Sequence, residues 1–117
     1  MKVYGFTGNG AREMEVENTL EGLQQFVGGY IECIGLTKEL VLICNEEGKI
    51  NGLPITTIWH EDGEVVEMIA GPCLVCRSDE EGEFVSIMDS DISVIREKLM
   101  SGWNIGEGKD GVTLMFL

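Results

Sequence analysis

The feature that most constrains the fold lies in residues 30–45, where two β-prone runs follow each other closely. The first run reads "YIECIGL" and the second "ELVLICN". Both are rich in the β-branched and large apolar residues that strands favour. Only Thr37 and Lys38 separate the runs, so we predict a tight antiparallel hairpin.

Further strands are predicted along the chain from short alternating or apolar runs. Residues 2–7 and 12–17 form a second hairpin across a Gly-Asn-Gly turn. The apolar run at 65–77 is interrupted at Gly71 and Pro72, since proline has no donor for a sheet ladder. The remaining predicted strands are residues 55–59, 84–88 and about 112–117, the last after a glycine-rich loop.

Two short helices are also predicted. The first starts with Asn18 as N-cap and Glu21 at the third helical position, a capping box, and ends at Gly28 and Gly29. The second opens at Asp89 or Ser90 and runs to Gly102. Their apolar stripes are Leu20, Leu23, Phe26 and Val27 in the first and Ile92, Ile95, Leu99 and Met100 in the second. The chain of 117 residues therefore reads as one α+β domain, a mostly antiparallel sheet with two short helices packed on it.

The charge balance limits the partners. Twenty-one acidic residues oppose eight basic ones, for a formal net charge of -13. Free DNA or RNA is a poor partner, because binding phosphate backbones requires clustered lysine and arginine. No apolar run approaches the ~20 residues that span a bilayer, and the first residues lack an apolar signal core. We expect a cytoplasmic protein without membrane contact.

The cysteines and the histidine do not predict a metal site or a catalytic centre. Cys73 and Cys76 form a C-x-x-C pair, but residues three apart on a strand point to opposite faces. Cys33 and Cys44 lie within predicted strands, where cysteine acts as a small hydrophobe. His60 is the only histidine and lies in a turn-like stretch. We predict no cofactor, no metal and no enzymatic activity, although paired carboxylates remain an alternative.

The loop at residues 45–54, "NEEGKINGLP", is the strongest candidate for a binding surface. Its asparagines and glycines can adopt turns that direct N–H groups outward, and Pro54 stiffens the exit. Leu53 requires burial and would anchor the loop. A structural crossover between strands is the alternative interpretation.

Two quoted segments carry a resemblance to a known family. "NTLEGLQQFVGGYIE" and "CNEEGKINGLP" resemble the small bacterial and phage proteins grouped as "domain of unknown function 3846". The resemblance covers about residues 1–90, with its core at 18–54, and is weaker from residue 89 onward. An Asn-Arg pair often follows the proline in that family, whereas Ile55 and Thr56 stand here.

The resemblance implies an accessory protein of a phage or mobile element, and we hypothesise that it counters host defence by binding. The first hypothesis is sequestration of a nucleotide immune signal, in a pocket often built at the interface of a homo-oligomer. The alternatives are an acidic inhibitor that occludes a basic site on a host defence or DNA-binding protein, a nucleotide-acting enzyme, and a purely structural module. The candidate binding residues are Gly28, Gly29, Tyr30, Asn45, Gly48, Lys49, Asn51, Gly52, Leu53, Pro54 and Arg77, with Lys49 and Arg77 as phosphate contacts.

Overall fold

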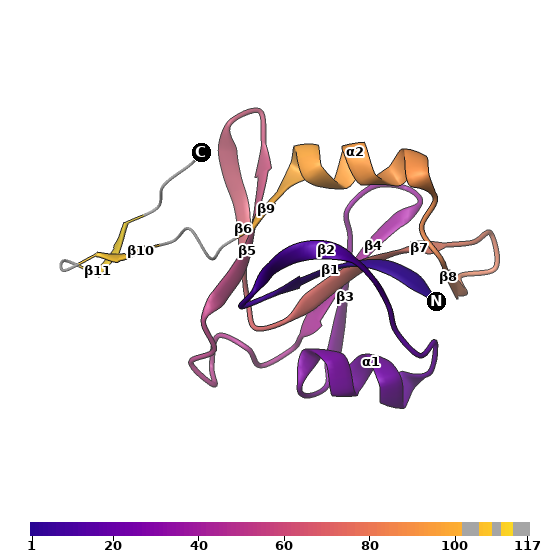
Figure 1. Ribbon diagram of the computed structural model, residues 1–117, viewed down its shortest axis with the longest axis horizontal. Coiled ribbons are helices and arrows are strands. Elements are labelled where there is room, and N and C mark those ends of the chain that lie inside the picture. Colours follow the sequence, from indigo (N-terminus) through magenta and orange to yellow (C-terminus); the bar gives the residue numbers. More distant parts are fainter. Residues whose placement is uncertain (102–105, 109–110, 114–117) are drawn as a thin grey trace.

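The computed structural model describes residues 1–101, 106–108 and 111–113 of the chain. Its strands form two sheets flanked by two helices, together with one short separate hairpin (Figure 1). Every described strand pairing is antiparallel. The predicted α+β class is therefore confirmed, but the strands divide into more than the one sheet that the sequence predicted.

The main sheet has six strands in the order β2-β1-β7-β4-β3, and β8 pairs with β7 off this path. The predicted β3–β4 hairpin is present, but its turn is longer than the two residues predicted, since β3 ends at Gly35 and β4 starts at Leu40, with Leu36 donating its N–H to the carbonyl of Leu40. β2 and β3 are the outer strands of the five-strand path. The strands are β1 (Lys2–Thr7), β2 (Gly10–Glu15), β3 (Ile31–Gly35), β4 (Leu40–Asn45), β7 (Cys73–Ser78) and β8 (Phe84–Val85).

The second sheet has the strand order β6-β5-β9. It consists of β5 (Ile55–Glu61), β6 (Glu64–Ala70) and β9 (Leu99–Ser101). A separate hairpin pairs β10 (Gly106–Gly108) with β11 (Gly111–Thr113). Of the last predicted strand, only residues 112–113 fall within β11, and residues 114–117 lie outside the described part of the chain.

Helix α1 (Leu20–Val27) begins one residue later than predicted. Thr19, not Asn18, is the N-cap, and its hydroxyl accepts a hydrogen bond of 3.0 Å from the N–H of Gly22. Asn18 instead donates its side-chain amide to the carbonyl of Phe84. Gly28 ends the helix with φ at 83°, the left-handed conformation predicted there.

Helix α2 (Asp89–Lys98) is shorter than predicted, because Leu99 and Met100 belong to β9 instead. Leu99 pairs with Trp59 and Met100 with Ile58 across β5 and β9. The spacing of Leu99 fits a helical stripe, but its pairing in a sheet buries it equally well. Neither described helix has the length and apolar character needed to cross a membrane.

The core is divided between the two faces of the main sheet, and the helices lie on opposite sides of it (Figure 1). α1 covers a cluster made by Val3, Leu23, Val27, Ile43, Leu74 and Cys76. The second sheet and α2 cover a larger cluster that includes Phe6, Leu42, Cys44, Cys73, Val75 and Ile95. Cys73 and Cys76 thus lie in different clusters, which confirms that they point to opposite faces of β7.

The assignment of the α1 cap is testable by comparing two alanine substitutions. Thr19→Ala removes the acceptor for the N–H of Gly22 and should cost about 0.5–2 kcal/mol of the free energy of unfolding. Asn18→Ala removes only an exposed hydrogen bond and should cost under about 0.5 kcal/mol. Urea unfolding followed by circular dichroism measures both, and the reverse order would restore Asn18 as the cap.

Candidate functional site

The predicted loop crosses from the main sheet to the second sheet, since it joins β4 to β5. Most of its backbone N–H groups donate hydrogen bonds within the protein. The N–H of Glu46 donates to the carbonyl of Tyr30, and that of Leu53 to the carbonyl of Gly48. The prediction of outward N–H donors is wrong for the amides that donate within the protein, which are those of Glu46, Glu47, Gly48, Asn51, Gly52 and Leu53.

Asn45 joins the start of this loop to the end of α1. Its side chain is only 8% exposed. The Nδ2 group donates to the carbonyl of Val27 at 3.2 Å, and Oδ1 accepts from the N–H of Glu47 at 2.8 Å. A Cβ on Gly29 would lie 3.0 Å from Nδ2, so glycine at that position leaves room for the amide. The structure therefore brings Gly28 and Gly29 to Asn45, as part of the scaffold.

The rest of the loop packs at two points against the segment that links β6 to β7. Gly48 approaches so closely that a Cβ would lie 2.4 Å from the carbonyl oxygen of Ala70. Leu53 is half-buried over Gly71, whose N–H donates to the carbonyl of Pro54 at 2.8 Å. Asn51, Gly52 and Pro54 remain exposed on the loop, and Tyr30 is 68% exposed beside it.

Arg77 does not join the loop surface. It stands opposite Leu40 at the start of β4, whereas the loop follows the other end of that strand. Five residues of strand span about 17 Å. The guanidinium pairs with Asp91 at 2.5 Å, and the other carboxylate oxygen of Asp91 accepts from the N–H of Met88. Arg77 therefore holds the start of α2 against the main sheet.

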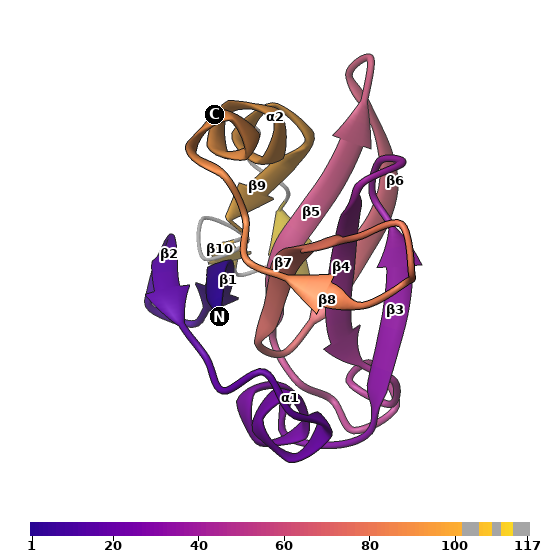
Figure 2. The same ribbon diagram turned by 90° about the vertical axis from the view of Figure 1, so that its right-hand side faces the viewer.

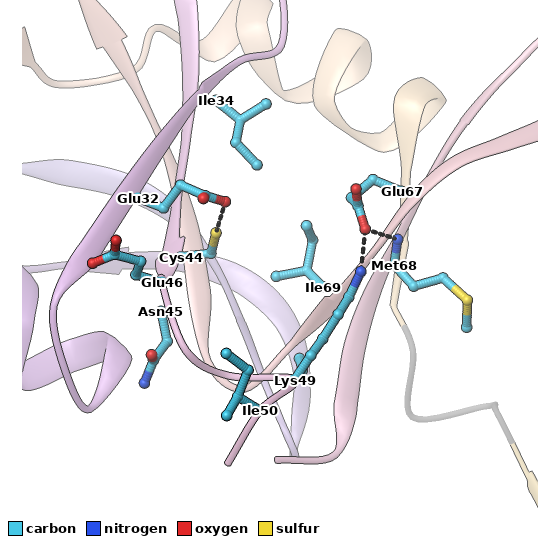
Figure 3. A pocket seen from close by; sticks show the side chains of 11 residues that line it. Glu32, Ile34, Cys44, Asn45, Glu46, Lys49, Ile50, Glu67, Met68 and Ile69 are labelled. Carbon is cyan, nitrogen blue, oxygen red and sulfur yellow. Dashed lines mark hydrogen bonds and ion pairs between the residues drawn. The ribbon is translucent and has the colours of Figure 1, made fainter. Parts of the chain in front are cut away.

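A cavity of about 120 Å³ opens where the loop leaves β4, between β3, β4 and β6 (Figure 3). Glu32 reaches into it from β3, and Glu67 with Lys49 faces it from the opposite side (Figure 3). Of the predicted site residues, only Asn45 and Lys49 line it. The complete lining is Glu32, Ile34, Cys44, Asn45, Glu46, Lys49, Ile50, Glu67, Met68, Ile69 and Ala70.

The electrostatics of the cavity are dominated by carboxylates. The ammonium of Lys49 is hydrogen-bonded to Glu67, and this bond lowers the pKa of the Glu67 carboxyl. Glu32 accepts from the thiol of Cys44 at 3.8 Å. Burial, reinforced by the charge of Glu32, raises the pKa of that thiol to about 12, so it stays protonated at neutral pH. The lining thus includes three carboxylates, those of Glu32, Glu46 and Glu67, and the ammonium of Lys49, which is already paired with Glu67.

Comparison with known proteins places the chain in a family. A family model described as "Domain of unknown function (DUF3846)" matches residues 1–100. The chain belongs to this family. No curated protein and no solved structure matches it. The resemblance found in the sequence is confirmed, and the DUF3846 match extends beyond residue 90 to include α2 and the start of β9.

Two carboxylates of the DUF3846 cavity were missed by the sequence reasoning. Glu32 lies directly opposite Cys44 in the β3–β4 register, whereas the predicted two-residue turn would have put it opposite Ile43. Glu67 lies on β6 in the other sheet, and nothing in the sequence indicates which part of that sheet faces the cavity. Cys33 is exposed at the sheet edge, so its predicted role as a buried hydrophobe is wrong.

Other groups that could carry chemistry are dispersed in the DUF3846 fold. Within the described residues, no three side chains among histidine, cysteine, aspartate and glutamate are grouped as metal ligands. His60 lies in β5 instead of a turn, and the turn itself is Asp62 and Gly63, both with positive φ.

The structural role of Asn45 predicts a loss of stability on substitution. Asn45→Ala leaves the carbonyl of Val27 and the N–H of Glu47 without partners, which should cost about 1–3 kcal/mol of the free energy of unfolding. Asn51→Ala is the matched control, because Asn51 is exposed, and should change it by under about 0.5 kcal/mol. Equal urea midpoints for the two variants would contradict the scaffold role.

The buried thiols predict a loss of stability at high pH. Burial raises the pKa of Cys73 to about 11 and that of Cys76 to about 12, from 9.0 in an ordinary thiol. Above pH ~9 the unfolded chain releases thiol protons that the folded chain retains, so stability is full below that pH and falls above it. The urea midpoint should drop as the pH is raised from about 9 to about 11. Cys76→Ala should reduce this drop more than Cys33→Ala, and equal drops would contradict the assignment.

Proposed function

We propose that this DUF3846 chain is a non-enzymatic binding protein that occludes a basic site on a partner protein. The observation that carries the proposal is the charge of the cavity. Glu32, Glu46 and Glu67 line it, and among the described residues that line it the one ammonium, that of Lys49, is already paired with Glu67. A cavity of this kind attracts a lysine or arginine side chain and repels an anion.

The acidic surface elsewhere on the protein supports the same interpretation. Ion pairs with described cationic groups engage six of the 21 acidic side chains, those of Glu13, Glu15, Glu61, Glu67, Asp89 and Asp91. The turn between β7 and β8 holds Glu80, Glu81 and Glu83 in exposed positions, fixed by hydrogen bonds to Asp79. Such a field speeds encounter with a positively charged surface.

The geometry gives less support to nucleotide sequestration, which stays a prediction. Phosphate groups require cations with free donors, and Lys49 and Arg77 are each paired with a carboxylate. The cavity beside the loop, at about 120 Å³, is also small against the roughly 300–1,000 Å³ of pockets that hold small molecules, and the cavity of about 470 Å³ beside Arg77 is lined by three further carboxylates, those of Glu39, Asp79 and Glu80. Enzymatic action on a nucleotide likewise stays a prediction.

The family resemblance suggests where the partner is to be found. Relatives in phages, plasmids and conjugative elements favour a host defence or DNA-binding protein, whose nucleic-acid site would supply the basic surface. We therefore include a role against host defence in the proposal.

The proposal is tested by direct binding. The purified chain is immobilised, host extract is passed over it, and each retained protein is purified and measured for affinity. Exposed charges are screened over about 10 Å at 0.1 M salt and about 3 Å at 1 M. We therefore expect a partner with a basic surface whose dissociation constant rises at least tenfold between these salt concentrations.

Native mass spectrometry with a panel of cyclic and linear nucleotides tests the two competing hypotheses, sequestration and enzymatic action. If a nucleotide binds without any change in its own mass, and no salt-sensitive protein partner is found, the sequestration hypothesis would replace this proposal. A ligand converted to a product would replace it with an enzyme.

A further inference from the structure

We propose that the free edge of β3 docks an extended, basic segment of the partner protein. The segment adds as a strand to the main sheet and places one arginine or lysine side chain in the cavity. This inference rests on the proposed function, since it names the part of the partner that is bound and the place where it lies.

The backbone of β3 has unpaired groups along its outer side. Within the described part of the chain, β3 ends the strand path of the main sheet and pairs with β4 alone. The carbonyl of Tyr30 accepts from the N–H of Glu46, and the N–H of Leu36 donates to the carbonyl of Leu40. The even-numbered residues of this segment therefore direct their backbone N–H and C=O groups toward β4. In an antiparallel ladder, successive residues direct their backbone N–H and C=O groups alternately toward and away from the neighbouring strand. Ile31, Cys33 and Gly35 therefore direct their N–H and C=O groups outward.

This edge lacks the protection that the opposite edge has. Proteins block exposed strand edges with charged side chains, proline or a covering element. β2, at the other end of the path, carries Arg12, Glu13 and Glu15. β3 carries one charge, that of Glu32, and no proline. In Figure 2 β3 lies at the outer margin of the sheet, with both helices placed away from its free side. An open edge of this kind accepts an extended peptide through main-chain hydrogen bonds.

The cavity adjoins this edge and specifies the side chain. Side chains of an added strand would alternate between the two faces of the sheet. Those on the face of Glu32 would point toward the space between β3 and β6. A guanidinium or ammonium there meets the carboxylates of Glu32 and Glu67. Exposed Tyr30 and Ile50, which are 68% and 83% exposed, flank the site and suit the apolar stem of a long basic side chain.

Charge also identifies the occupant of the edge as a partner of opposite charge, and argues against a second copy. Pairing of two β3 strands would bring together two chains that each carry a net charge of -13. A basic segment relieves that repulsion, and the carboxylates of the cavity provide its counter-charges.

The first experiment uses a defined peptide. An acetylated heptapeptide of alternating threonine and arginine is titrated into the full-length protein by calorimetry. The control peptide has the same sequence with N-methyl groups on alternate residues, which keeps the charge but blocks strand addition. We expect the first peptide to bind at least tenfold more tightly, which corresponds to about 1.4 kcal/mol.

The second experiment changes the protein. Cys33→Pro removes an outward N–H and leaves the β3–β4 ladder intact, so it should weaken peptide binding at least tenfold without loss of the folded state by circular dichroism. Cys33→Ser retains the N–H and should therefore bind the peptide at least tenfold more tightly than Cys33→Pro. Glu32→Gln should weaken peptide binding several-fold. The matched control is Glu97→Gln, which removes the same charge from the exposed side of α2 and should not weaken binding.

Three outcomes overturn the inference. Equal binding of both peptides, unaffected by Cys33→Pro, shows general attraction to an acidic surface, and the proposed function then stands without the β3 edge. Absence of peptide binding while a basic partner is still retained from extract also removes only the edge. A dimer of the wild-type chain that Cys33→Pro dissociates assigns the edge to a second copy.

Discussion

Three strands in the middle of the main sheet, β1, β4 and β7, are buried on both faces. Leu42 and Val75 are turned to one side and Ile43 and Leu74 to the other, and all four are 0% exposed. Burial of each such side chain contributes roughly 1.5–3 kcal/mol, so neither face can be left open to water. Helix α1 meets that requirement on one face, and the second sheet with α2 meets it on the other.

This double burial determines where charge can be placed. An ionised group in the interior costs several kcal/mol unless it is paired and hydrogen-bonded. Asp91, which is 6% exposed, satisfies that condition through Arg77 and the N–H of Met88. Glu32 and Glu67 lie instead at the margin between the sheets, where water still reaches the carboxylates. The cavity owes its acidic character to this position beside the core.

The sequence contained most of the local structure, because the signals for it are local. Period-two alternation and turn residues located the hairpins, and the opposite orientation of Cys73 and Cys76 follows from strand geometry. The predictions that were wrong concern features that depend on contacts between distant residues. Asn18 and Thr19 are equally good caps, and the choice is made by a hydrogen bond from Asn18 to Phe84, 66 residues away. Leu99 fits a helix by spacing and joins β9 because β5 offers it a partner.

The candidate site was harder to predict for the same reason. Asn45 and Lys49 were found from the composition of the loop, but the sequence could not show that Asn45 faces α1 or that Lys49 meets Glu67. A site built between two sheets requires the relative placement of those sheets, which is fixed by packing and not by any motif.

The position of β7 at the centre of the main sheet has a consequence for how the chain is made. Tyr4 of β1 pairs with Val75 of β7, so this strand pairing cannot form until a segment 71 residues later has been synthesised. Contacts between residues this far apart in sequence slow folding, whereas α1 and the local hairpins β1–β2, β3–β4 and β5–β6 can form early. Until β7 emerges from the ribosome, the nascent chain exposes apolar strands without their neighbour. The strong negative charge keeps such chains apart during that interval and so protects the protein from aggregation before it folds.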